Sequence, residues 1–130
     1  MNEPRWLTRD IAIALHDESL AHFGGPEGIR DEALLESALA RPRQRFADGA
    51  KPSLAELAAA YGFGVIRNHP VTDGNKRAGL LGVAVFLDIN GLQFHPDEVD
   101  EVRTILAVAA GELGEAEFSS WIAANARVRS

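Results

Sequence analysis

The chain has 130 residues, of which 46% are hydrophobic and 25% are charged, with a formal net charge of −6 and no cysteine. This length and composition predict one globular domain over residues 1–130, and the lack of cysteine excludes disulfides and thiolate metal sites. Lysine and arginine are scattered outside one short loop, which argues against a nucleic acid as the main partner.

The sequence predicts no membrane-spanning segment and no secretory leader. Its longest wholly apolar run, Ala78–Leu87, is ten residues long, whereas a transmembrane helix needs about 20. The polar stretch Met1–Arg5 does not resemble the start of a signal peptide. We therefore expect a cytoplasmic protein with no membrane partner.

The first two helices are predicted from capping residues and apolar spacing. Thr8 is a suitable N-cap for a helix that continues to about Phe23, and Asp31 is a suitable N-cap for the next one. Arg41-Pro42 is expected to end this second helix, because proline disfavours the helical conformation before it. From Arg43 to Pro52 the pattern is irregular, and we expect a short hairpin or a mobile flap.

Two apolar helices are predicted on either side of a polar loop. Ser53 and Glu56 form a capping box that begins a helix over Leu54–Asn68. Two glycines interrupt this helix, and such residues are tolerated best where another helix approaches closely: Gly62 and Gly64. The helix after the loop, Asn75–Ile89, is apolar on nearly every side, so we expect it at the centre of a bundle.

Two further helices are predicted towards the C-terminus. Asn90-Gly91 closes the apolar helix, and Asp97 precedes a helix that reaches Ala109. The basic residues Arg127 and Arg129 suit the C-terminal end of a last helix. That last helix carries three large apolar residues, Phe118, Trp121 and Ile122. The fold class is therefore all-α, a bundle of about six helices around one central apolar helix.

The residues suited to chemistry gather in the loop before the Asn75–Ile89 helix, where residues 69–77 read HPVTDGNKR. His69 can act as a general base, and Asp73 can hold a divalent cation. Asn75, Lys76 and Arg77 supply donors and positive charge for phosphate oxygens at a helix N-terminus. Cations at that position oppose the helix dipole, which points to function and not to stability.

Structural roles are the alternative for several residues. His69 precedes a proline and could cap backbone carbonyls, but its polar neighbours favour chemistry. Glu56 is expected to cap a helix and not to catalyse. The other three histidines lack the spacing of metal ligands and are expected to be surface or half-buried residues: His16, His22 and His95. Both tryptophans are expected in the core: Trp6 and Trp121.

The loop resembles the signature of the Fic/Doc family, H-x-F-x-[D/E]-[G/A]-N-[G/K]-R. The resemblance extends to LHDESLAHFGGPEGIRDEALLESALARP and to LAAAYGFGVIRNHPVTDGNKRAGLLGVAVFLDINGLQF. Over almost its full length the chain is similar to the Doc (death-on-curing) branch of the family. It implies an all-α bundle with the motif between two central helices.

This resemblance also implies roles for single residues. His69 would deprotonate the hydroxyl of a target, and Asp73 would bind Mg²⁺ or orient the acceptor. The stretch Arg43–Lys51 would be a flap over which the target peptide lies. Five residues would bind the nucleotide: Asn75, Lys76, Arg77, Gly74 and Arg67.

Two positions distinguish the chain within the family. Val71 stands where the family usually has phenylalanine, and Lys76 stands where the nucleotidyl-transferring members have glycine. The lysine implies a toxin kinase that transfers the terminal phosphate of ATP, with Mg²⁺, to a threonine of elongation factor Tu. A separate, Phd-like antitoxin would inhibit it by folding onto the toxin. The alternatives are AMP transfer to a protein hydroxyl and a non-catalytic binding protein on the same fold.

Overall fold

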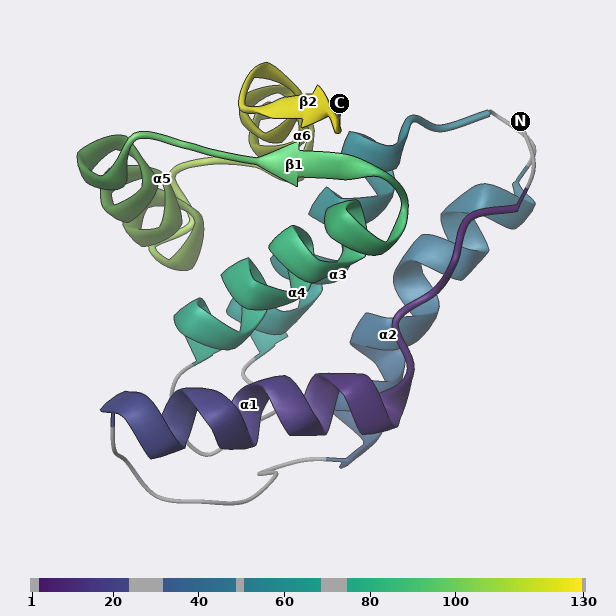
Figure 1. Ribbon diagram of the computed structural model, residues 1–130, viewed down its shortest axis with the longest axis horizontal. Coiled ribbons are helices and arrows are strands. Elements are labelled where there is room, and N and C mark those ends of the chain that lie inside the picture. Colours follow the sequence, from purple (N-terminus) through teal and green to yellow (C-terminus); the bar gives the residue numbers. More distant parts are fainter. Residues whose placement is uncertain (1–2, 24–31, 49–50, 69–74, 130) are drawn as a thin grey trace.

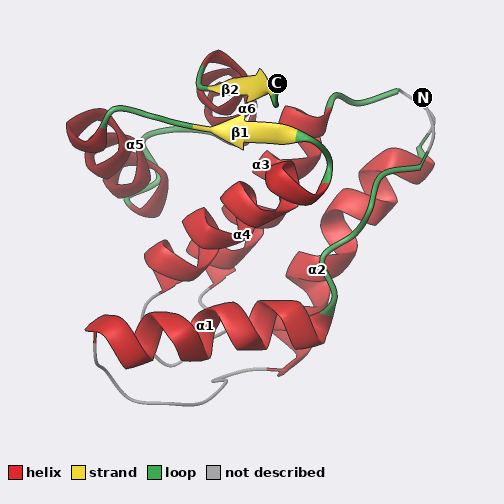
Figure 2. Cartoon of the chain, viewed as in Figure 1, coloured by secondary structure: helices red, strands yellow, loops and turns green. Residues whose placement is uncertain are grey.

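Six helices and two short strands form the described part of the chain in a computed structural model, which covers residues 3–23, 32–48, 51–68 and 75–129. Figure 1 and Figure 2 show their arrangement. In chain order they are α1 (Arg9–Phe23), α2 (Glu32–Ala47), α3 (Leu54–Asn68), α4 (Asn75–Ile89), β1 (Leu92–Phe94), α5 (Glu98–Ala109), α6 (Glu115–Ala124) and β2 (Ala126–Val128). The predicted all-α bundle is confirmed. No helix within these ranges is long and apolar enough to cross a membrane.

The centre of the bundle is α3, which packs against α2, α4, α5 and α6. Leu57, Ala58 and Ile66 of α3 are completely buried. In α4, by contrast, Leu80 and Val85 are only half-buried. The prediction that Asn75–Ile89 is the central helix is therefore wrong. Because α3 is rich in alanine and glycine, neighbouring helices can approach it from several sides.

Glycines allow α3 and α4 to pack closely and antiparallel. A Cβ atom added at Gly62 would lie 2.7 Å from Val83 Cγ2, and one added at Gly79 would lie 2.7 Å from Ile66 Cγ1. Both distances are too short for a real side chain, so these contacts require glycine. The predicted close approach at Gly62 is confirmed. Because α4 runs back along α3, the end of α3 and the start of α4 lie together, and these are the two flanks of the HPVTDGNKR motif.

The second helix continues through Pro42 and ends at Ala47. The predicted end at Arg41-Pro42 is wrong. Residues 43–47, which were predicted as part of a short hairpin or mobile flap over Arg43–Pro52, belong to this helix instead. A proline inside a helix costs about 3 kcal/mol, and contacts made by the last turn offset that cost. Phe46 packs edge-on against Trp6, with ring centroids 5.6 Å apart, and Arg45 pairs with Glu56 at 2.6 Å.

Predicted N-caps are confirmed wherever the structure describes them. Thr8 Oγ1 accepts a hydrogen bond from the backbone N–H of Ile11. Asp97, predicted only as an acidic residue at a helix start, is also an N-cap and accepts a hydrogen bond from the backbone N–H of Asp100. Residues 53 and 56 form the reciprocal bonds of a capping box. These bonds satisfy backbone donors that a helix leaves unpaired in its first turn. Asp31, the other predicted N-cap, lies outside the described residues.

Two segments predicted as a linker and as a helix end are strands. β1 and β2 pair antiparallel, with Leu92 opposite Val128 and Phe94 opposite Ala126. Gly91, at φ +88°, turns the chain from α4 into β1, as the Asn90-Gly91 prediction required. Arg127 lies in β2, and Arg129 beyond it pairs with Asp88 at 2.7 Å. The expectation that this basic tail caps the last helix is therefore wrong.

Candidate active site

The structure describes both flanks of the motif. His69, Val71, Asp73 and Gly74 lie outside the described residues, as does the side chain of Asn75, whose backbone begins α4. The described members of the predicted site are Lys76 and Arg77 in the first turn of α4 and Arg67 in the last turn of α3. What the site can do is therefore argued from these three side chains and their surroundings.

Lys76 and Arg77 stand at the edge of a groove between α4 and α5. Lys76 is exposed and Arg77 is half-buried, and the first turn of α4 carries no acidic residue. The groove has a volume of about 210 Å³. Its walls are mostly apolar, and the lining residues are Lys76, Arg77, Leu80, Glu101, Val102, Ile105 and Leu106. Positive charge beside a helix N-terminus suits an anion such as a phosphate.

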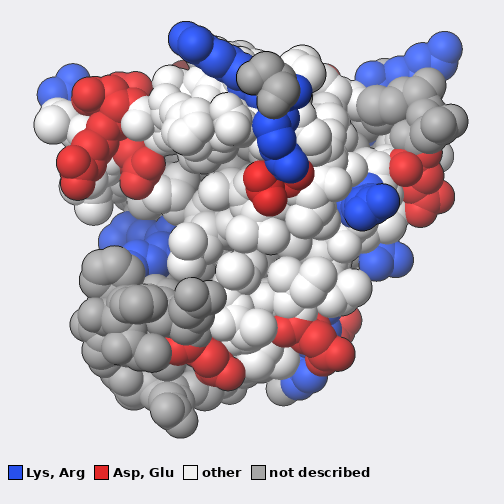
Figure 3. Space-filling model, viewed as in Figure 1, with Lys and Arg blue, Asp and Glu red and all other residues white. Residues whose placement is uncertain are grey.

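Glu101 is the carboxyl group that lines this groove. The partial burial of Glu101 raises its pKa, and repulsion from Glu98 raises it further. In Figure 3 one group of acidic side chains lies over α5, whose first turn carries Glu98, Asp100 and Glu101, and positive side chains lie below it towards the start of α4. The groove thus joins a basic edge from α4 to an acidic edge from α5.

Arg67 is positioned by the far end of α5 and does not line the groove. Its Nη1 atom donates a hydrogen bond to the carbonyl oxygen of Val108, at 3.3 Å. Gly111, at φ +80°, leaves room for the guanidinium, because a Cβ atom there would lie 2.8 Å from Nη1. An arginine at a helix C-terminus is favoured by the helix dipole. The structure therefore places Lys76 and Arg77 together at the groove, whereas Arg67 contacts the C-terminal end of α5.

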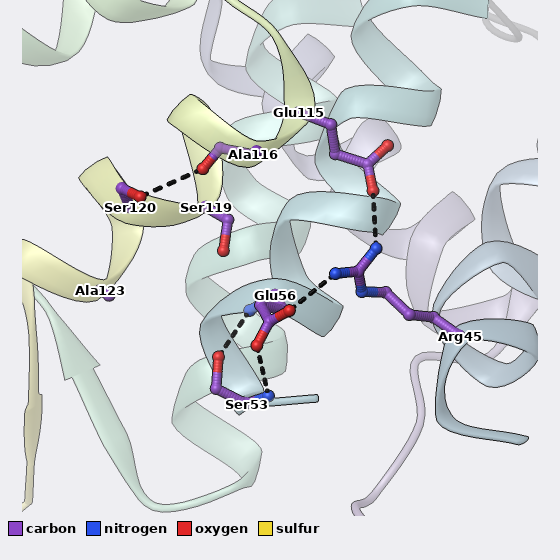
Figure 4. A pocket seen from close by; sticks show the side chains of 8 residues that line it. All are labelled: Arg45, Ser53, Glu56, Glu115, Ala116, Ser119, Ser120 and Ala123. Atoms are coloured by element: carbon purple, nitrogen blue, oxygen red, sulfur yellow. Dashed lines mark hydrogen bonds and ion pairs between the residues drawn. The ribbon is translucent and has the colours of Figure 1, made fainter. Parts of the chain in front are cut away.

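A larger polar cleft, of about 640 Å³, lies between α2, α3 and α6 (Figure 4). In it Arg45 lies between two carboxylates, 2.6 Å from Glu56 and 3.9 Å from Glu115, and Glu115 also pairs with Arg41. A backbone hydrogen bond from Ser53 lowers the pKa of Glu56, and the bond from Arg45 lowers it further. The predicted capping role of Glu56 is confirmed. The charges of this cleft pair with one another and join three helices.

The same cleft shows where the predicted flap lies. Arg45 contacts the first turn of α3, and the motif follows the last turn of α3. A helix of 15 residues is about 22 Å long. Residues 43–48 are therefore at the opposite end of α3 from the flanks of the motif, and they do not cover those flanks. Residues 49 and 50 lie outside the described ranges.

A model of the Fic/DOC family matches residues 6–87, which include the motif and most of α4. Over 109 residues the chain is 31% identical to "Protein kinase doc" of Escherichia phage P1, with 84% of this chain and 86% of that protein covered. Over 86 residues it is 40% identical to "Toxin Doc" of Mycolicibacterium smegmatis, with 65% of this chain and 66% of that protein covered. The chain belongs to the Fic/DOC family. Both relatives are Doc proteins, and the chain belongs to the Doc branch.

Outside its motif, this Doc-branch protein buries a histidine that the sequence did not single out. His16 was expected to be at the surface or half-buried, but it is only 3% exposed. It lies among Ala12, Leu35, Tyr61 and Ala78, and its Nε2 atom has no hydrogen-bond partner in the described parts of the chain. The prediction for His16 is wrong because the apolar surfaces of four helices meet there. Burial of the neighbouring tyrosine raises the pKa of Tyr61 to about 12.

The remaining aromatic and histidine predictions are partly confirmed. His95 is exposed, as predicted, whereas the side chain of His22 lies outside the described residues. Trp6 and Trp121 are half-buried and pack against the core, so they are not fully internal. Trp121 keeps its indole N–H satisfied by donating to Asp100 Oδ2 at 2.7 Å.

Sequence reasoning about the motif missed the contribution of α5 in this Doc-branch chain. Its apolar residues at positions 99, 102, 105 and 106 indicate a helix with an apolar face, but Ile105 is buried while Val102 and Leu106 stay 55% and 53% exposed. The exposed side chains of Val102 and Leu106 lie beside Lys76 and Arg77, and together they line the groove. The described residues contain no group of three or more His, Cys, Asp or Glu that could hold a metal ion.

Proposed function

We propose that this Doc-like toxin is a protein kinase, which transfers the terminal phosphate of ATP to a threonine hydroxyl of elongation factor Tu and so arrests translation. The observation that carries the proposal is Lys76 in the first turn of α4, followed by Arg77, at a helix N-terminus with no nearby acid in that turn. Similarity to a protein named as a kinase, over 84% of this chain, supports the same reaction. The choice of elongation factor Tu rests on the family resemblance alone.

The proposed reaction assigns a role to each polar residue of the motif. His69 takes the proton of the threonine hydroxyl, whose oxygen then bonds to the terminal phosphorus of ATP. The bond between that phosphorus and its bridging oxygen breaks, and ADP leaves. Lys76 and Arg77 neutralise the charge that develops on the phosphate oxygens, with Asn75 and the backbone at Gly74 as donors.

The donor set suits Mg²⁺ as the ion that accompanies the nucleotide. Mg²⁺ usually needs one or two carboxylates and takes its other ligands from phosphates and water. Asp73 would be that carboxylate, because it is the acidic residue of the motif. The ion would supply charge neutralisation on the phosphates. Arg67 donates one hydrogen bond to the end of α5, and its other guanidinium N–H groups would assist in binding the nucleotide.

The proposed partner is a cognate, Phd-like antitoxin, since a curated relative is itself named a toxin. A disordered segment of the antitoxin would fold into a helix on the toxin and inhibit it. The proposed setting is the cytoplasm, with no direct role for nucleic acid or membrane.

Two labelled nucleotides test the proposed reaction. We expect ATP labelled at its terminal phosphate to label elongation factor Tu, and ATP labelled at the α-phosphate to leave it unlabelled. The reverse result would establish AMP transfer instead. His69→Ala is the matched control, and it should abolish both the label and growth arrest in cells. Growth arrest that survives His69→Ala would favour a non-catalytic binding protein.

A further inference from the structure

The turn after α5 makes room for the guanidinium of Arg67. Gly111 stands in this turn at φ +80°, a conformation that glycine adopts easily and other residues adopt rarely. Its backbone N–H donates to the carbonyl oxygen of Val108 at 3.1 Å, and the same oxygen accepts the bond from Arg67 Nη1 at 3.3 Å. A carbonyl oxygen has two lone pairs and can accept both bonds. The end of α5 is therefore capped by its own turn and by a cation from α3.

The charge of Arg67 is favoured by two helices at once. Arg67 lies in the last turn of α3, and its guanidinium contacts the last turn of α5. Each helix C-terminus carries partial negative charge, which attracts a cation. Arg67 is nevertheless exposed. Its bond to Val108 uses one N–H group, and a guanidinium has several more. The side chain is thus held in place at the flank of the motif while it keeps donors for a ligand.

A methyl group at residue 111 would displace this guanidinium. A Cβ atom at Gly111 would lie 2.8 Å from Nη1 of Arg67 and 3.6 Å from both Cζ and Nη2. Non-bonded heavy atoms in favourable contact are about 3.5 Å apart, so Nη1 would have to move away from Val108. The atom that moves is the far end of a long, exposed side chain, so the shift disturbs no closely packed core.

We propose that Gly111 is a positioning residue for the proposed phosphate transfer, because its lack of a side chain lets Arg67 dock on Val108 with other N–H groups directed to a phosphate of ATP. This inference rests on the proposed function and deepens it, since it gives a turn outside the motif a part in nucleotide binding. A guanidinium that is held before the nucleotide arrives loses less side-chain freedom on binding, so its charge-assisted hydrogen bonds contribute more to affinity.

The test compares Gly111→Ala with Gly91→Ala. Gly91 is also exposed and has φ +88°, but a Cβ atom there would meet nothing within 4 Å. Both substitutions therefore impose similar backbone strain, whereas Gly111→Ala alone of the two displaces Arg67. Binding of ATP with Mg²⁺ to the full chain is measured by isothermal titration calorimetry, and the melting temperature of each variant by circular dichroism.

We expect the two glycine variants to lose similar amounts in melting temperature. Gly111→Ala should in addition bind ATP about fivefold more weakly, whereas Gly91→Ala should bind it as the wild type does. Arg67→Ala should weaken binding by about tenfold. Adding Gly111→Ala to Arg67→Ala should cause no further loss, because the glycine acts through the arginine. Equal ATP affinity in the two glycine variants, or losses that add in the double variant, would overturn the inference.

The kinase reaction is measured separately, as transfer of labelled terminal phosphate to elongation factor Tu. A loss of ATP affinity through Arg67 in a protein whose wild type transfers no phosphate would support the inference and refute the kinase. Wild-type transfer, with Gly111→Ala and Gly91→Ala equal in ATP affinity and in transfer rate, would support the kinase and overturn the inference.

Discussion

Replacing Gly82 with alanine is expected to destabilise the contact between α3 and α4, the two helices that flank the motif. A Cβ atom at this position would lie 2.1 Å from Cε2 of Tyr61, 2.8 Å from Cδ2 and 3.1 Å from Cζ. Carbon atoms in favourable contact are about 3.5 Å apart, so the nearest ring atom would have to move by about 1.4 Å. Tyr61 is buried in a closely packed core, where such a shift disturbs neighbouring side chains.

Two opposing free-energy terms set the size of the effect. Overpacking of a core costs about 1–3 kcal/mol, whereas replacing glycine by alanine inside a helix gains about 1 kcal/mol. Because the nearest contact would be only 2.1 Å, the overpacking should cost about 2–3 kcal/mol, and the free energy of unfolding should fall by a net amount of about 1–2 kcal/mol. For a domain of this size the melting temperature should drop by about 3–10 °C. Urea denaturation followed by far-UV circular dichroism measures the change, and the slope with denaturant should stay constant.

A second background shows whether the clash with Tyr61 is the cause. Tyr61→Val ends at Cγ and so removes all three ring atoms that the new methyl group would meet: Cδ2, Cε2 and Cζ. In that background, Gly82→Ala should be neutral or should stabilise the fold by up to about 1 kcal/mol, because only the helix-propensity term remains. An equal loss of stability in both backgrounds would refute the reasoning, and so would a more stable Gly82→Ala in the wild-type background.

The remaining predictions concern charge. The hydrogen bond from Ser53 and the pairing with Arg45 lower the pKa of Glu56, so the charged form stabilises the fold above about pH 4.5 and this contribution is lost as the pH falls further. Glu56→Gln should therefore lower the free energy of unfolding by on the order of 0.5 kcal/mol at pH 7. Urea titrations should show that this difference between the variant and the wild type vanishes by about pH 3. A difference that stays constant with pH would contradict this prediction. Lys76→Ala and Arg77→Ala should each weaken ATP binding by calorimetry while the melting temperature stays near wild type; a large loss of stability would instead mark these residues as structural.

Signals that act over a few residues made much of the fold predictable. Thr8 and Ser53 each bond to a backbone N–H three residues ahead, so their capping roles could be recognised directly from the sequence. The predicted bounds of the motif helices, Leu54–Asn68 and Asn75–Ile89, match α3 and α4. The residue types and spacing of the motif likewise predicted the family.

Features that depend on distant partners were not predictable in the same way. Helix α2 passes Pro42 because its last turn packs on Trp6, which lies far back in the chain. The pairing of β1 with β2 joins a linker to the C-terminal segment. His16 is buried because four helices converge on it. None of these contacts has a local sequence pattern that indicates its partner.

The features of the candidate site likewise fall into those that the local sequence predicts and those that depend on tertiary contacts. The sequence by itself determined the helix starts, the close α3–α4 contact and the cluster of phosphate-binding residue types, because short-range hydrogen bonds and side-chain size are local properties. Only the tertiary structure decided that α3 is the central helix, that Arg67 bonds to the end of α5, and that Val102 is exposed while Ile105 is buried. The physical reason is that burial depends on which surfaces meet, and an apolar face does not specify the helix that covers it.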